Sequence, residues 1–187
     1  RIPFKIDVDV TDIVLTQVRK DLQGQKGFTD QNWNQAANWS MNNGGDMEEA
    51  LAWSEAAISA PFIGVENYNN LQTKAQILNK MGKGEEADKV MEIAMEKGTV
   101  FQVHNYGRQL IAQGEKEKAL EVFKKNAKMH KDTWPVNYGL ARGYSALGDY
   151  KKALQYLEKA HDLAPQQANK DRVQANMEKL KKGEDIN

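Results

Sequence analysis

The chain has 187 residues, and its 26 Lys and Arg residues balance its 26 Asp and Glu residues, so the formal net charge is zero. The chain therefore has no excess of basic residues of the kind that would indicate nucleic acid or an anionic membrane surface as a partner. The absence of cysteine excludes disulfides, thiolate metal sites and a cysteine nucleophile, and no apolar run approaches the roughly 18 residues that a membrane-spanning helix needs.

Residues 1–10 have the alternating pattern of a strand, with an apolar side chain at every second position from Ile2 to Val10. A single strand has no pairing partner in a chain that is otherwise helical. We therefore interpret residues 1–10 as an extended arm or as the remnant of an upstream domain, and the chain as a piece of a longer protein. Pairing of this arm between two chains would give a homodimer.

A helical period dominates the rest of the chain. Residues 11–29 are predicted to form an N-terminal helix and a linker, with Thr11 or Asp12 as the helix cap and Gly24 at the helix end. Residues 30–165 alternate between helical segments with one apolar face and turns that contain glycine. Residues 166–187 are predicted to form an amphipathic helix and a tail, which would cover the open end of the stack.

An internal repeat runs through residues 30–165 and predicts four helix pairs. Each pair has an alanine in its second helix, and these are Ala50, Ala87, Ala119 and Ala153, spaced 37, 32 and 34 residues apart. Each alanine has a glycine five residues before it, and these are Gly45, Gly82, Gly114 and Gly148. Because glycine adopts the left-handed backbone of a tight turn without strain, we expect it to form the turn between paired helices.

The segment Trp134–Pro165 carries the clearest repeat and resembles a tetratricopeptide repeat (TPR). The positions that carry the resemblance are Leu140, Ala141, Tyr144, Ala153, Leu157, Ala160 and Pro165. The other units match less fully, since Asn38, Ser54 and Asn126 replace the usual small or aromatic residues. The resemblance implies an all-α fold, a right-handed α-solenoid of about four TPR-like helix-turn-helix repeats with an N-terminal helix and a C-terminal capping helix. It also implies an interaction scaffold.

The segment from Pro3 to about residue 60 carries a second, looser resemblance. It is similar to the junction in an uncharacterised family of bacterial proteins, in which a β-rich domain of unknown function precedes TPR-like helices. Members of that family are commonly exported, so the resemblance implies an exported or periplasmic protein. The alternative function is then an accessory C-terminal domain that packs against, or supports, the upstream domain.

Catalytic and metal-binding patterns are absent from the sequence. The three histidines, His104, His130 and His161, lie too far apart in sequence to form a helical zinc motif. The segment MGKGEE at 81–86 lacks the spacing and the Ser or Thr of a phosphate-binding loop, and no nucleophile motif occurs. We therefore predict no enzyme activity, no cofactor and no metal.

The concave face of a TPR-like stack is formed by the first helix of each pair. Positions two, five, nine and twelve of each unit share that face at helical spacing. The residues selected in this way as peptide-binding candidates are Gln35, Trp39, Gln72, Gln76, His104, Arg108, Tyr138 and Arg142. The amides suit an extended peptide backbone, and the arginines suit an acidic side chain.

These candidates support the leading hypothesis, a non-catalytic scaffold that binds a protein or an acidic peptide segment through its concave face. TPR domains that bind a terminal carboxylate use Lys residues together with a Lys-x-x-x-Arg motif. Here Arg108 and Arg142 match the arginine of that motif, but the lysines are missing, which puts that specific mode of carboxylate binding in doubt. The alternative is that the same side chains are only solvated, or that they contact the terminal helix or the upstream domain.

Overall fold

The computed structural model describes residues 9–131 and 133–187, and every regular element in these residues is helical. The expected all-α fold is therefore confirmed. The segment that we expected to be strand-like, residues 1–10, lies outside the described residues except for Asp9 and Val10. Asp9 is the N-cap of the first helix, because its side chain accepts a hydrogen bond from the backbone of Asp12, and Val10 is the first helical residue. The expectation that Thr11 or Asp12 forms this cap was wrong.

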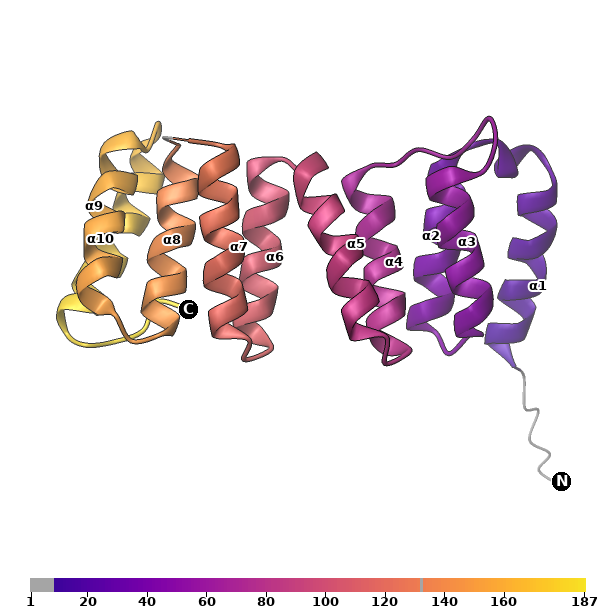
Figure 1. Cartoon of the computed structure of the whole chain (residues 1–187), viewed down its shortest axis with the longest axis horizontal. Coiled ribbons are helices and arrows are strands. Elements are labelled where there is room, and N and C mark those ends of the chain that lie inside the picture. The colour runs from indigo at the N-terminus through magenta and orange to yellow at the C-terminus, as the bar shows by residue number, and fades with distance from the viewer. Residues whose placement is uncertain (1–8, 132) are drawn as a thin grey trace, which may run out of the picture. The chain divides into compact units, whose positions relative to one another are not determined.

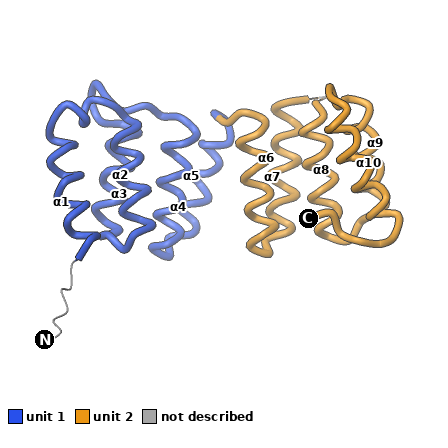
Figure 2. The backbone as a smooth tube through the Cα atoms, turned by 180° about the vertical axis from the view of Figure 1, so that it is seen from behind, with its two compact units in different colours: residues 1–97 blue, residues 98–187 orange. Residues whose placement is uncertain are grey.

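The chain divides into two compact units between Lys97 and Gly98 (Figure 2). The first unit contains α1 (Val10–Gln23), the short 3-10 helix η1 (Gln25–Phe28), α2 (Asp30–Asn42), α3 (Met47–Ser59), α4 (Tyr68–Lys80) and α5 (Gly84–Lys97). The second unit contains α6 (Val100–Ala112), α7 (Lys116–Met129), α8 (Trp134–Ala146), α9 (Tyr150–Leu163) and α10 (Gln167–Lys181). Figure 1 labels these helices in chain order.

Four TPR-like helix pairs make up the repeats, namely α2 with α3, α4 with α5, α6 with α7, and α8 with α9. The turns within the pairs contain glycines with positive φ, which are Gly44, Gly82, Gly114 and Gly148. At three of these turns the glycine is the predicted one, but in the first pair it is Gly44 rather than Gly45. A Cβ on Gly45 would collide with the Ser40 hydroxyl, so Gly45 is required by close packing and not by its backbone conformation.

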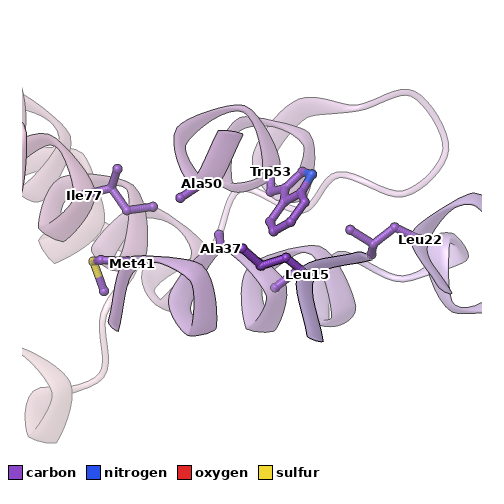
Figure 3. Packing of buried hydrophobic residues seen from close by; sticks show 8 residues of the cluster. Leu15, Leu22, Ala37, Met41, Ala50, Trp53 and Ile77 are labelled. Carbon is purple, nitrogen blue, oxygen red and sulfur yellow. The ribbon is translucent and has the colours of Figure 1, made fainter. Parts of the chain in front are cut away.

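The core of the first unit joins α1 to the first two helix pairs (Figure 3). Its buried side chains are Leu15, Leu22, Ala36, Ala37, Met41, Ala50, Trp53 and Ile77. At the edge of this core, Arg19 of α1 donates two hydrogen bonds to the Glu49 carboxylate of α3, at 2.7 and 2.8 Å. The N-terminal helix is therefore packed as part of the unit.

Phe123 of α7 is fully buried in the second unit. A Cβ added to Gly107 of α6, or to Gly139 or Gly143 of α8, would come within 2.6–3.0 Å of the Phe123 ring. The three glycines thus let α6 and α8 approach the ring closely. On α10, Val173 and Leu180 are buried against α8 and α9, so this helix covers the end of the second unit, as its amphipathic pattern predicts.

None of the helices in the described part of the chain is both long enough and apolar enough to cross a lipid bilayer.

Candidate functional site

The first helices of the two pairs in the second unit bring four of the predicted site residues together. His104 and Arg108 lie one helical turn apart on α6, and Tyr138 and Arg142 lie one turn apart on α8. All four line one cavity of about 220 Å³. The other residues that line this cavity are Phe101, Asn105, Trp134, Pro135 and Arg172.

A second cavity of about 480 Å³ lies beside the first, and the two share Asn105, Arg108 and Arg142. Its other lining residues are Gln109, Ile111, Ala112 and Asn187. Because the shared residues border both cavities, the two form one depression along α6 and α8. We call this depression, with the lining residues named above, the α6–α8 groove.

His104 and Tyr138 form the wall of the groove, and both side chains are buried. Their rings stack at 6.2 Å between centroids with an angle of 9° between planes, and His104 also contacts Phe123. The hydroxyl of Tyr138 accepts a hydrogen bond of 2.6 Å from the Asn176 side chain of α10. The wall is thus held by aromatic packing and by a contact to the last helix.

The imidazole of His104 is neutral at physiological pH. Its pKa is lowered to about 4, mainly by burial and then by the neighbouring positive charge of Arg142. A neutral ring suits the contact in which Nδ1 donates to the carbonyl oxygen of Pro135 at 3.2 Å. His104 therefore adds no positive charge to the groove.

The positive charge of the groove comes from Arg108, Arg142 and Arg172. The Arg142 guanidinium lies over the Tyr138 ring at 5.2 Å, a cation–π contact that fixes its position. Its Nη1 donates to the Asn187 side-chain oxygen at 3.3 Å, while its buried Nε has no acceptor among the described residues. None of the described residues that line the groove is Asp or Glu.

Residues 185–187 close one end of the groove against α8. The Ser145 hydroxyl donates to the Asp185 carboxylate at 2.6 Å, Ile186 is buried, and the Asn187 amide donates to the Arg142 carbonyl at 3.2 Å. Burial acts to raise the pKa of Asp185, but the hydrogen bonds from Ser145 and Asn187 outweigh it and hold that pKa below its usual value. Ser145, which the helical spacing places on the inner face, is therefore covered by the chain's own tail.

The remaining predicted site residues lie in the first unit. Gln35 and Trp39 of α2 line a cavity of about 330 Å³ together with Val14 and Val18 of α1, so α1 borders the same face of α2. The other two predicted residues, Gln72 and Gln76, are half-buried on α4 and line neither this cavity nor the α6–α8 groove. The structure thus places the eight candidates in two separate units.

The groove residues that the helical spacing did not select include Asn105, Trp134 and Arg172. Asn105 and Arg108 are three positions apart on α6, so the helical period contained the signal for Asn105. Trp134 is the first residue of α8 and lies in contact with Tyr138 at 6.0 Å between ring centroids. Arg172 directly precedes the buried Val173 on α10, but which side of that helix meets α8 was not encoded in its apolar pattern.

Within residues 9–131 and 133–187, no group of three or more His, Asp or Glu side chains is arranged to hold a metal ion.

The likenesses of this chain to known proteins include a family model and a solved structure. The sequence model of the family described as "Regulator of microtubule dynamics protein 1-3" (RMD1-3) matches residues 109–183, which is less than half of the chain. The chain is also similar to the crystal structure of YrrB, described as a TPR protein with an unusual peptide-binding site. The two share 20% sequence identity and a TM-score of 0.49, over 88% of this chain and 84% of that chain. The search of curated proteins gave no match.

Proposed function

We propose that this chain is a non-catalytic interaction module, and that the α6–α8 groove binds an acidic segment of a partner protein. One observation carries the proposal: Arg108 and Arg142 face the same depression, and none of its described lining residues is Asp or Glu. Helical repeat pairs of this kind commonly present an inner surface to an extended partner. Charge-assisted hydrogen bonds from guanidinium groups to carboxylates would provide the specific contacts.

The aromatic wall supports the same proposal. The side chain of Phe101 is 54% exposed at the edge of the groove, and that of Trp134 is half-buried beside it. Exposed aromatic surface next to arginines is the composition of protein-binding hot spots. We therefore expect the partner segment to place an apolar side chain beside its acidic one.

The test measures binding of the full chain to a peptide library with a central Asp or Glu flanked by varied residues. We expect peptides with an adjacent apolar residue to bind best. The double substitution Arg108→Ala/Arg142→Ala should weaken their binding about tenfold or more, because one to two charge-assisted hydrogen bonds are lost.

The matched control is Lys116→Ala/Lys179→Ala, which removes two positive charges from exposed positions outside the groove on α7 and α10. Equal weakening by both double variants would mean that only the overall charge matters. No acidic peptide bound by the unaltered chain, or binding unaffected by the arginine substitutions, would contradict the proposal.

A further inference from the structure

We propose that the anionic group recognised by the α6–α8 groove is a phosphorylated side chain of the partner segment. This inference rests on the proposed function, because it names the ligand chemistry of the same groove. It depends on the number of positive charges in the groove, on the kind of residue that supplies them, and on a hydrogen-bond donor of Arg142 that has no acceptor among the described residues.

The lining carries three guanidinium groups, from Arg108, Arg142 and Arg172, and none of its described residues is acidic. A carboxylate would neutralise one of these charges, whereas a phosphorylated side chain carries a charge of about −1.5 to −2 at pH 7. The groove thus matches a doubly charged group better than a single Asp or Glu.

The chain contains 26 basic residues, of which only five are arginine: Arg1, Arg19, Arg108, Arg142 and Arg172. Three of these five line the groove, and none of the more numerous lysines in the described part of the chain does. Lysine suffices for a solvated positive surface, whereas arginine offers a planar fork of donors that fits phosphate oxygens two at a time.

The Nε of Arg142 is buried without an acceptor among the described residues, and its Nη1 makes only the 3.3 Å contact to Asn187. A buried donor without a partner costs free energy, which a ligand oxygen would recover. The cation–π contact with Tyr138 holds this guanidinium in place before any ligand arrives. A phosphate has three oxygens and can accept from Arg142 and from a second guanidinium together.

The position of Arg172 adds a specific expectation. It comes from α10 and lines only the cavity of about 220 Å³, beside Phe101 and Trp134, whereas Arg108 and Arg142 border both cavities. The phosphate should therefore lie in the smaller cavity, where all three arginines meet. The apolar neighbour of the phosphorylated residue would then contact Phe101 or Trp134.

The experiment compares four peptide series with the same mixture of residues at the flanking positions. The series differ only at the central residue, which is phosphoserine, phosphotyrosine, glutamate or serine. Binding to the full chain is measured by fluorescence anisotropy. We expect one of the phosphorylated series to bind about tenfold or more tightly than the glutamate series, because each adds charge and acceptors. Arg172→Lys should abolish most of this preference while keeping the net charge. Lys179→Gln, on the same helix but outside the groove, should leave the preference unchanged.

The outcomes separate this inference from the proposed function. If glutamate peptides bind as tightly as phosphorylated ones and Arg108→Ala/Arg142→Ala weakens both, the phosphate inference is overturned and the proposed function stands. If phosphorylated peptides bind but the arginine double variant binds them equally well, the site lies elsewhere, and both are overturned. If no peptide series binds, both are likewise overturned.

Discussion

At the residue scale, the buried imidazole of His104 makes the stability of the protein depend on pH. Its pKa falls from an ordinary 6.5 to about 4 on folding, mainly because of burial and then because of Arg142. The unfolded chain therefore binds a proton more readily than the folded one between these two values. Since the folded pKa is the lower one, this stability is complete above about pH 6.5 and is lost as the pH falls toward about 4.

We expect the free energy of unfolding to be about 2 kcal/mol lower at about pH 5 than at about pH 7.5 from this group alone. Urea denaturation at both pH values measures the difference. Other groups also titrate in this range, so the informative quantity is the difference between the unaltered chain and His104→Gln, whose neutral amide can still donate to the Pro135 carbonyl. Identical pH dependence in the two proteins would show that His104 is already protonated in the folded state or is solvated.

At the element scale, the packing of α6, α7 and α8 depends on glycines that face Phe123. Gly139→Ala would place a methyl group 2.7 Å from the Phe123 ring and 3.0 Å from Nδ1 of His104. In a helix interior, alanine is intrinsically better than glycine by about 1 kcal/mol. The clash outweighs this gain, because overpacking a close-packed core costs about 1–3 kcal/mol. We expect Gly139→Ala to destabilise the protein by about 1 kcal/mol net, measured by thermal or urea unfolding.

The matched control is Gly84→Ala at the start of α5, where an added methyl group would meet only the Asn79 side chain, at 3.9 Å. There we expect no loss of stability, and a small gain. If Gly139→Ala were as stable as the unaltered chain, Phe123 would have room to move, and the close approach of the helices would not depend on the glycines.

Sequence periodicity predicted the helix pairs because the same physical requirements recur in each of them. Small residues such as Ala119 and Ala153 are needed where paired helices meet, and both are fully buried. The departures from the TPR pattern have local explanations that no pattern contained. Asn126 is buried and donates to the carbonyl of Val100 at 3.0 Å, and Ser54 donates to the carbonyl of Leu51 at 2.7 Å.

The candidate site was less predictable than the fold, because it depends on contacts between elements far apart in sequence. The helical spacing selected His104, Arg108, Tyr138 and Arg142, which line one cavity in the structure, but it could not show that two of the four are buried. It also could not predict that residues 185–187 pack against α8, since the contact between Ser145 and Asp185 joins residues 40 positions apart. Periodicity describes one helix at a time, and such contacts lie outside it.

At the scale of the whole molecule, the two compact units each have a core of their own. The cluster around Leu15 and Trp53 belongs entirely to the first unit, and the cluster around Tyr138 and Leu157 belongs entirely to the second. Cooperative unfolding follows shared buried surface, so a helical repeat protein can open in parts. We therefore expect each unit to respond separately to a substitution in its own core.

Amide hydrogen exchange of two single variants tests this expectation. Leu15→Ala removes a buried side chain of α1, which costs about 2–5 kcal/mol in a well-packed core, and should lower protection in residues 9–97. Gly139→Ala should instead lower protection in residues 98–187, because its clash lies against Phe123 and His104. Each variant is the control for the other. Loss of protection throughout the chain in both variants would mean that the protein unfolds as one cooperative body, and that a ligand bound in the α6–α8 groove would stabilise both units together.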